Sequence, residues 1–251
     1  MASEKKTAIV TGAGAGIGRA IATRLAADGA RVVAADIHGV HETVALLRQA
    51  GHEAMAIEAD VSDEAQVRAM ASQAHSAFGT IDILVNNAAL STALRMKPFE
   101  EIEVSEWLKV MAVNTMGPFL CCKAVSSVMR AQKSGRIVNM TSGVAFKGSP
   151  FLMHYVASKG ALMSMTRALA NELGDSGVTV NAVSPGYTLS EGALANAEFH
   201  RRYGPAAVQG RALKREAYPS DVVGAVAFLA GPDSTFITGQ ILSVDGGLVY
   251  H

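Results

Sequence analysis

Short apolar runs rich in β-branched residues alternate with longer helical stretches along the 251-residue chain. The runs are continuously hydrophobic, which is typical of parallel strands covered on both faces. This alternation predicts an α/β fold, a single doubly wound Rossmann domain whose parallel sheet has about seven strands with helices on both faces. The predicted strands are 7–13, 31–37, 53–61, 81–89, 135–142, 178–186 and 239–247. The predicted helices are 16–30, a helix that ends near Leu47, 63–78, 104–132, 154–174 and 219–230.

No break in composition and no internal repeat divides the chain, so one domain over residues 1–251 is expected. The least regular segment is 188–218, which follows the sixth predicted strand. Open α/β sheets bind ligands beyond the carboxyl ends of their strands, and a long insertion at such a place is typical of a lid. We therefore expect a substrate lid at about 188–218.

Charge and composition exclude several classes of partner. Basic and acidic residues both number 22, without a basic run or an acidic tail, which argues against nucleic acid and anionic membranes. No apolar run could span a bilayer, and the N-terminal "MASEKK" does not resemble a secretory signal. The adjacent Cys121 and Cys122 suit neither a disulfide framework nor a metal, so we expect buried thiols, a cytoplasmic protein and no metal site.

A glycine-rich turn joins the first predicted strand to the first predicted helix, with the spacing Thr11-Gly12-x-x-x-Gly16-x-Gly18. Glycines let the backbone approach a pyrophosphate, which then lies on helix N–H groups. Any tight strand–helix turn can use glycine, so the context decides the interpretation. Here that context favours a dinucleotide loop that includes Ala15 and Ile17.

Asp36 closes the second predicted strand, roughly twenty residues after the loop, where an acidic residue can bind the adenosine ribose hydroxyls. The alternative is a helix N-cap or an ordinary strand-end carboxylate. Neither Ala15 nor Ile37 offers a positive charge to a 2′-phosphate, which the Asp36 carboxylate would repel. The pattern favours NAD over NADP.

Tyr155 and Lys159 lie four residues apart in a predicted helix, so their side chains share one face. Such a pair is common, and the alternative is a buried tyrosine with a surface lysine. A tyrosine has an ordinary pKa of about 10, and an ammonium about 4 Å away contributes about 4 kcal/mol at an effective dielectric near 20. That is enough to lower the pKa by about three units, so Lys159, helped by the positively charged nicotinamide ring, is expected to make Tyr155 a usable acid or base near neutral pH.

Taken with further motifs, these residues resemble the short-chain dehydrogenase/reductase family from about residue 7 to 247. The resemblance implies an NAD-dependent oxidoreductase that interconverts a secondary alcohol and a ketone. The motifs are Thr11-Gly12-x-x-x-Gly16-Ile17-Gly18, Asp60-Val61, Asn86-Asn87-Ala88-Ala89, Asn114, Ser142, Tyr155-x-x-x-Lys159, Pro185-Gly186 and "FITGQILSVDGG" at 236–247.

The resemblance also implies roles. Tyr155 is the expected acid/base, and Lys159 binds the nicotinamide ribose. Ser142 is expected to bond the reacting oxygen, and Asn114 to hold a water in a proton relay. Besides Tyr155 and Lys159, the expected cofactor-binding residues are Gly12, Ala15, Gly16, Ile17, Gly18, Asp36, Asp60, Val61, Asn86, Asn87, Gly186, Thr188 and Ser190. Ala89 stands where the family usually has glycine, and either Thr188 or Ser190 could offer the hydroxyl for the carboxamide.

Three functions are alternatives to an NAD-dependent alcohol oxidoreductase. A 3-oxoacyl thioester reductase usually uses NADP, which Asp36 disfavours. A non-catalytic dinucleotide-binding protein would usually lack the tyrosine, lysine or serine. An epimerase or dehydratase of this fold needs a larger C-terminal substrate domain.

Most residues that we expect to line the substrate pocket are apolar, which suits an apolar or aromatic alcohol. Phe151 and Met153 are expected near the reacting carbon, although cations in the lid segment leave an anionic substrate open. The expected pocket residues are Leu90, Leu94, Val144, Phe146, Phe151, Met153, Tyr187, Leu189 and Leu194, and the cations are Arg201, Arg202, Arg211, Lys214 and Arg215.

The predicted helices 104–132 and 154–174 carry apolar residues on more than one face, which suggests that a partner subunit covers one of them. Family members commonly associate in this way, so we expect a homotetramer. The alternative is a helix covered within its own subunit. The residues concerned are Phe119, Leu120, Val128, Leu162, Met163, Met165 and Leu169.

Overall fold

The computed structural model describes residues 5–250, which form a sheet of seven parallel strands in the order β3-β2-β1-β4-β5-β6-β7. The strand order changes direction between β1 and β4, which creates the crevice where such sheets bind ligands. The α/β fold class and all seven predicted strands are confirmed. The strands are β1 Thr7–Thr11, β2 Arg31–Asp36, β3 Ala54–Glu58, β4 Ile83–Asn86, β5 Gly135–Met140, β6 Val178–Pro185 and β7 Ile241–Val244.

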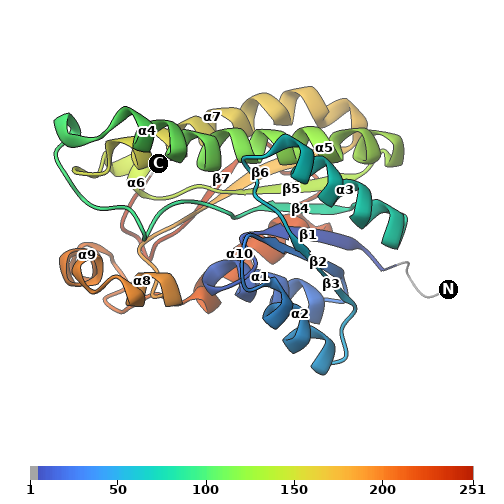
Figure 1. The fold of residues 1–251 in the computed structure, drawn as a ribbon, viewed down its shortest axis with the longest axis horizontal. Coiled ribbons are helices and arrows are strands. Elements are labelled where there is room, and N and C mark those ends of the chain that lie inside the picture. Colours follow the sequence, from blue (N-terminus) through green and yellow to red (C-terminus); the bar gives the residue numbers. More distant parts are fainter. Residues whose placement is uncertain (1–4, 251) are drawn as a thin grey trace.

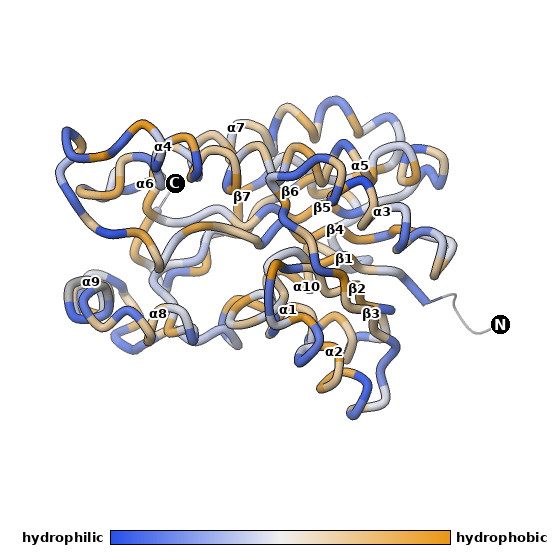
Figure 2. Tube along the Cα trace, viewed as in Figure 1, coloured by the Kyte–Doolittle hydropathy of each residue, from blue (hydrophilic) through white to orange (hydrophobic). Residues whose placement is uncertain are grey.

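Helices cover the sheet in two layers (Figure 1). One layer holds α3 (Glu64–Phe78), α4 (Val104–Met111), α5 (Gly117–Gln132) and α7 (Met153–Leu173). The other holds α1 (Gly16–Ala27), α2 (Val40–Gln49) and α10 (Pro219–Ala230). Each layer buries its own apolar cluster against the sheet, and hydrophobic positions concentrate along the strands between them (Figure 2). Burial on both faces explains why the strands are continuously apolar.

Local sequence sets where the elements begin and end. In α3, the N-cap Asp63 accepts hydrogen bonds from the N–H groups of Ala65 and Gln66, and Gly79 ends the helix at a φ of 77°. Both features are standard helix-terminus chemistry. Short 3₁₀ turns occupy Phe99–Glu101, Gly174–Ser176 and Pro232–Ser234. No helix within 5–250 is both long enough and apolar enough to cross a membrane.

The structure differs from the predicted elements in two places. The predicted helix 104–132 is interrupted by a π-helical turn, Ala112–Met116, which joins α4 to α5. The segment 188–218 is also more regular than expected, because it contains α8 (Glu191–Ala195) and α9 (Ala197–Gly210). Together with α6 (Val144–Lys147), these helices lie beyond the carboxyl ends of the strands (Figure 1).

Candidate active site

The glycine loop is packed so tightly that side chains are excluded from it. A Cβ on Gly12, whose φ is +65°, would lie 2.7 Å from the Ala88 Cα, and a Cβ on Gly18 would lie 1.9 Å from the Gly12 carbonyl oxygen. Asn87, directly after β4, binds the loop: its Nδ2 donates to the carbonyls of Thr11 and Gly12 at 3.0 Å each. The result is a bare backbone at the start of α1, which is what a pyrophosphate requires.

A groove about 500 Å³ in volume runs along this loop, within the size range of small-molecule sites. Its lining includes residues that the sequence did not indicate, among them Lys109 of α4 and Gly192 of α8. Of the predicted cofactor residues, the groove is lined by Gly12, Ala15, Gly16, Ile17, Gly18, Asp36, Asp60, Val61, Asn87 and Ser190.

Asn86 does not reach this groove. Its side chain is buried in the sheet, where Nδ2 donates to Asn139 Oδ1 at 2.9 Å and contacts the Cys122 sulfur. Successive strand residues point to opposite sides, so only its neighbour Asn87 faces the loop. The expectation that Asn86 binds the cofactor is therefore corrected: its contacts are those of a core residue. Cys121 and Cys122 are free and buried as expected, and burial raises the pKa of Cys122 to about 12.

The Asp36 carboxylate is held by backbone donors at the end of β2. Its Oδ2 accepts from the Gly14 N–H at 2.9 Å, and its Oδ1 from the Ile37 N–H at 2.7 Å. A carboxylate has about four acceptor sites, so lone pairs remain for two ribose hydroxyls. Arg19, a nearby cation, is engaged by Glu42 and by the Thr43 hydroxyl at 3.0 Å.

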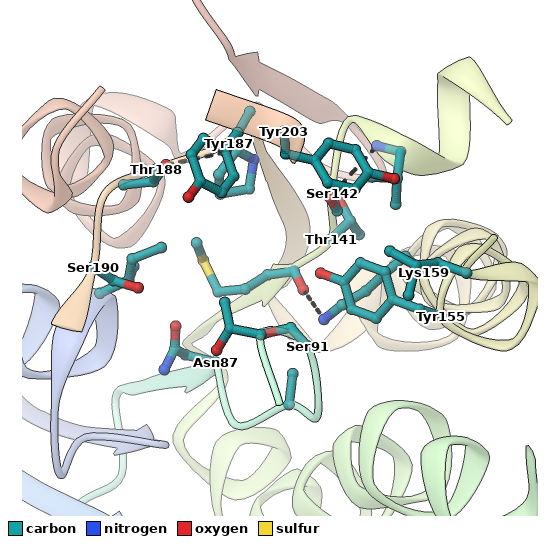
Figure 3. A pocket seen from close by; sticks show the side chains of 18 residues that line it. Asn87, Ser91, Thr141, Ser142, Tyr155, Lys159, Tyr187, Thr188, Ser190 and Tyr203 are labelled. Carbon is teal, nitrogen blue, oxygen red and sulfur yellow. Dashed lines mark hydrogen bonds between the residues drawn. The ribbon is translucent and has the colours of Figure 1, made fainter. Parts of the chain in front are cut away.

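Tyr155 and Lys159 project from α7 towards Ser142, which follows β5 (Figure 3). Ser142 and Tyr155 line the same lobe of the cavity, and the Lys159 ammonium donates to the Met140 carbonyl at 2.8 Å. Ser190 and Thr188 lie on the opposite side of the same pocket (Figure 3). The helix spacing thus brings the predicted phenol and ammonium together beside the predicted serine.

The chain by itself does not lower the pKa of Tyr155, whereas the expected lowering also included the positive charge of the nicotinamide ring. Burial raises the pKa of Tyr155 to about 12, although the Ser142 hydrogen bond opposes the rise. Burial likewise lowers the pKa of Lys159 to about 8. The Lys159 ammonium donates to the Met140 carbonyl at 2.8 Å and lies over the Tyr155 ring, 5.7 Å from its centroid.

Asn114 lies fully buried in the π-helical turn, and such turns are frequent at functional sites. Its Nδ2 donates to the Leu90 carbonyl at 3.0 Å and to the Ser158 hydroxyl at 3.1 Å, while its Oδ1 accepts from the Leu90 N–H at 2.8 Å. Ser158 in turn donates to the Tyr155 carbonyl. Asn114 therefore ties the loop after β4 to α7, and one lone pair of its Oδ1 remains.

The substrate side is a cavity with two lobes that share Ser142, Gly186 and Tyr187. The inner lobe contains Tyr155 and Lys159 and opens into the cofactor groove through Asn87 and other shared lining residues. The outer lobe lies between the segment 142–151 and α9. Of the predicted pocket residues, Val144, Phe151 and Tyr187 line this cavity.

The other predicted pocket residues do not line either lobe. Leu90 faces the cofactor groove, Leu94 is buried in an apolar cluster that packs against Tyr155, and Leu189 lines a small cavity within the lid. Met153 is 46 % exposed, so the expectation that it reaches the reacting carbon is wrong. Phe146 and Leu194 also lie outside the two linings. The lining residues that the sequence missed include Met96, Leu152, Tyr203, Ala206, Ala207 and Leu248. Three of them, Tyr203, Ala206 and Ala207, share one face of α9, and their helical spacing was the available signal.

Three of the lid cations, Arg211, Lys214 and Arg215, are used within the protein. Arg211 is buried and donates to the carbonyls of Ala207, Tyr187 and Arg215, while Arg215 itself pairs with Asp221 at 2.7 Å. Lys214 donates to the Gln209 carbonyl, Arg201 lines neither lobe, and the Arg202 side chain lies outside the described residues. The basic residue that lines the outer lobe is Lys147, which the sequence had not singled out.

Thr188 and Ser190 both line the inner lobe. Thr188 Oγ1 donates to the Gly186 carbonyl at 3.0 Å, which uses its proton within the chain. Ser190 Oγ accepts from the Ala193 N–H at 3.3 Å as the N-cap of α8, which leaves its proton available. Ser190 also lies close to the glycine loop, since a Cβ on Gly16 would be 3.3 Å from its Cβ.

Comparison with known proteins agrees with this geometry. The family model described as "Enoyl-(Acyl carrier protein) reductase" matches residues 12–249. The chain belongs to the short-chain dehydrogenase/reductase family. It is 39 % identical to a 3-oxoacyl-[acyl-carrier-protein] reductase of Synechocystis sp., over 97 % of both chains. It is 38 % identical to a cis-4-hydroxycyclohexanecarboxylate dehydrogenase of Sinomonas cyclohexanicum, over 97 % of this chain and 96 % of the relative.

Among solved structures, a variant of actinorhodin polyketide ketoreductase with NADPH superimposes with a TM-score of 0.93, at 33 % identity over 100 % of both chains. Membership of the family makes the protein a Rossmann-fold oxidoreductase that uses NAD or NADP. The relatives act on different substrates by name, so the family alone leaves the substrate open.

Proposed function

We propose that the protein is an NAD-dependent oxidoreductase that interconverts a secondary alcohol and a ketone, with an apolar or aromatic substrate. The observation that carries the proposal is the position of Tyr155, Ser142 and Lys159 where the cofactor groove opens into the substrate cavity. A carbon atom held there can exchange a hydride on one side while its oxygen exchanges a proton on the other. Bound NAD supplies the hydride acceptor.

Each polar group has a role in that exchange. Tyr155 takes the alcohol proton, or gives it to the ketone oxygen in reduction. Ser142 orients the same oxygen, and Lys159 binds the nicotinamide ribose with N–H groups that the Met140 carbonyl does not use. Because burial alone raises the pKa of Tyr155, the phenolate depends on positive charge arriving in the site, namely the oxidised nicotinamide. Asn114 has one lone pair of Oδ1 for the relay water.

For the cofactor, we propose NAD over NADP because the Asp36 carboxylate would face a 2′-phosphate. Gly186, Asp60 and Val61 would contact the nicotinamide and adenine ends. Ser190 rather than Thr188 would bind the carboxamide, since the Thr188 proton is used within the chain. Lys109 also lines this groove, and its positive charge could attract a 2′-phosphate and weaken the preference for NAD. The variant Lys109→Gln measures its effect separately.

For the substrate, the two lobes contain no carboxylate and few charges, which fits an uncharged ring or alkyl chain. Lys147 at the outer lobe allows a carboxylate at the far end of such a substrate, as in the hydroxycyclohexanecarboxylate that names one relative. The second candidate is reduction of a 3-oxoacyl thioester, favoured by the name of the 39 % identical relative.

We further propose a single catalytic domain closed by a lid at 188–218, acting as a cytoplasmic homotetramer. The lid bridges the site, since Asn196 of the lid donates to the Thr92 carbonyl at 2.7 Å. Of the apolar helix residues, Leu120, Leu162 and Met163 are buried within the subunit, whereas Phe119 is 47 % exposed, and Leu108 and Met116 are exposed too. These exposed residues support a covering partner. Light scattering at micromolar concentration tests it, and a monomer mass would refute it.

The decisive test is a panel of secondary alcohols with NAD and NADP, followed through the reduced cofactor. Methyl carbinols with longer alkyl or aryl groups should give rising kcat/KM with NAD, because each buried methylene contributes about 0.8 kcal/mol to binding. The reduction of acetoacetyl thioester should be slower than that of a cyclic or aryl ketone. A preference for the thioester with NADPH would favour the second candidate instead.

A further inference from the structure

A buried histidine stands directly before Tyr155 on α7. The His154 side chain is 0 % exposed, and its Nε2 lies 3.2 Å from Glu106 Oε1 of α4. Its Nδ1 is buried and has no hydrogen-bond partner among the described residues. Because a buried polar atom without a partner destabilises a fold, stability alone does not explain an imidazole at this position.

Glu106 has a second partner, Lys97, so the contact becomes a series of three residues, Lys97–Glu106–His154. Its Oε2 contacts the Lys97 ammonium, and the backbone N–H of Lys97 donates to the Phe151 carbonyl at 3.1 Å. Lys97, Glu106 and His154 thereby join the loop after β4, the helix α4 and the first turn of α7. Residues of that loop and of that first turn line the inner lobe of the cavity.

The series is more shielded from water than an ordinary surface ion pair. The side chains of Lys97 and Glu106 are 19 % and 24 % exposed, and His154 is fully buried. The pair Lys123–Glu64, by contrast, has 59 % and 58 % exposure. Solvent screens exposed pairs until they contribute little, whereas partly buried charges interact more strongly. The series is therefore able to fix the relative position of the segments that it joins.

The segments joined are those that present Tyr155. Successive helix residues point about 100° apart, so His154 faces α4 while Tyr155 faces the cavity. Just before α7, Phe151 has a φ of +67°, a left-handed conformation that is uncommon for a residue other than glycine. Such backbone persists where its surroundings hold it, and the Lys97 N–H is one group that does so here.

We propose that Glu106 and His154 are positioning residues: with Lys97, they hold the start of α7 and the segment 148–152 so that the Tyr155 hydroxyl meets the reacting oxygen. The proposal rests on the proposed function only in taking Tyr155 as the acid/base. On this view the unpartnered Nδ1 is tolerated because the other ring nitrogen reaches Glu106.

His154→Leu separates positioning from stability, because leucine removes the unpartnered nitrogen while Glu106 keeps Lys97 as a partner. We expect a Tm equal to or above that of the wild type, unchanged NADH affinity, and a kcat lowered about tenfold to hundredfold with little change in KM. Amide hydrogen exchange of the NADH-bound protein should be at least about tenfold faster in residues 148–159 and unchanged elsewhere. His154→Gln, which keeps a donor for Glu106, should recover most of the kcat.

Glu106→Gln provides the same test if His154→Leu does not fold, and Glu64→Gln is the matched control that should change nothing. The kcat readout uses the best alcohol of the panel, whereas the exchange readout needs no substrate. Wild-type protein that oxidises none of the alcohols would therefore count against the proposed function, while exchange still decides the positioning role. Unchanged exchange in 148–159, or a fall in kcat that follows a fall in Tm or NADH affinity, would overturn the proposal.

Discussion

The cofactor groove and the substrate cavity meet at Tyr155, yet they are built in different ways. The groove comes from tight turns at the ends of β1, β2 and β4, where a single added methyl group meets backbone at 1.9 Å. The cavity comes from several segments that are far apart in the chain, including 142–152, 185–188, α9 and Leu248. The difference teaches that the cofactor half tolerates almost no change, whereas the substrate half can vary its side chains within one fold.

The largest effect is expected where the two halves meet. Tyr155→Phe removes the proton-transferring hydroxyl and keeps the ring, so kcat should fall at least about a thousandfold while NAD affinity stays within about twofold. Stopped-flow turnover and NADH fluorescence measure the two quantities. A variant that retains a tenth of the wild-type activity would rule out this role for Tyr155.

The rigidity of the cofactor half predicts the next effect. Gly18→Val places a side chain against the Gly12 carbonyl, so NAD affinity should fall at least about a hundredfold. Ala206→Val, in the outer lobe of the substrate half, should leave NAD affinity unchanged and alter only KM. Calorimetric titration with NAD checks both variants. Equal NAD affinities for the two would show that the cofactor half is no more sensitive to an added side chain than the substrate half.

Burial of Lys159 predicts a dependence of stability on pH. Because its pKa falls from 10.5 to about 8 on folding, the unfolded chain binds more protons between these values, and stability rises with pH there. The free energy of unfolding should increase by about 2 kcal/mol more in the wild type than in Lys159→Met between pH 7 and 9.5. Tyr155 acts in the opposite direction only above pH 10. Urea titrations at each pH measure the slope, with the exposed Lys147→Met as the control.

Cofactor choice should respond to one carboxylate. The wild type is expected to prefer NAD at least about tenfold in kcat/KM, which corresponds to about 1.4 kcal/mol. Asp36→Ala should reduce that preference by a similar factor, and Lys109→Gln should change it less, since Lys109 belongs to α4 rather than to the end of β2. Equal use of both cofactors by the wild type would contradict the role given to Asp36.

The smallest effect belongs to the substrate half. Lys147→Gln should lower kcat/KM for a carboxylate-bearing ring alcohol about threefold to tenfold and leave its methyl ester unchanged, because an exposed charge contributes little. Lys214→Gln, whose ammonium already contacts the Gln209 carbonyl, should change neither value. A hundredfold effect would show that the apolar interpretation of the cavity is wrong.

The motifs near the strand ends could be predicted because they depend on neighbours in the chain. The loop Gly12–Gly18, Asp36 at the end of β2, and Tyr155 four residues before Lys159 all follow from local turn and helix geometry. Asn86 was assigned from the family resemblance, and the alternation of side chains along a strand leaves its neighbour Asn87 facing the groove instead. Met153 was misplaced for a similar reason, since which side of a helix end faces a cavity depends on its packing.

By itself, then, the sequence determined the α/β fold, the order of its elements and the residue types that bind a dinucleotide and transfer a proton, because local periods and turn spacings encode them. Only the tertiary structure decided which groups meet across long chain separations. It placed Tyr203 of α9 and Leu152 around the cavity, turned Lys159 towards Met140, and joined Lys97, Glu106 and His154 behind Tyr155. Burial and charge act through space, and these distances are set when the layers pack together.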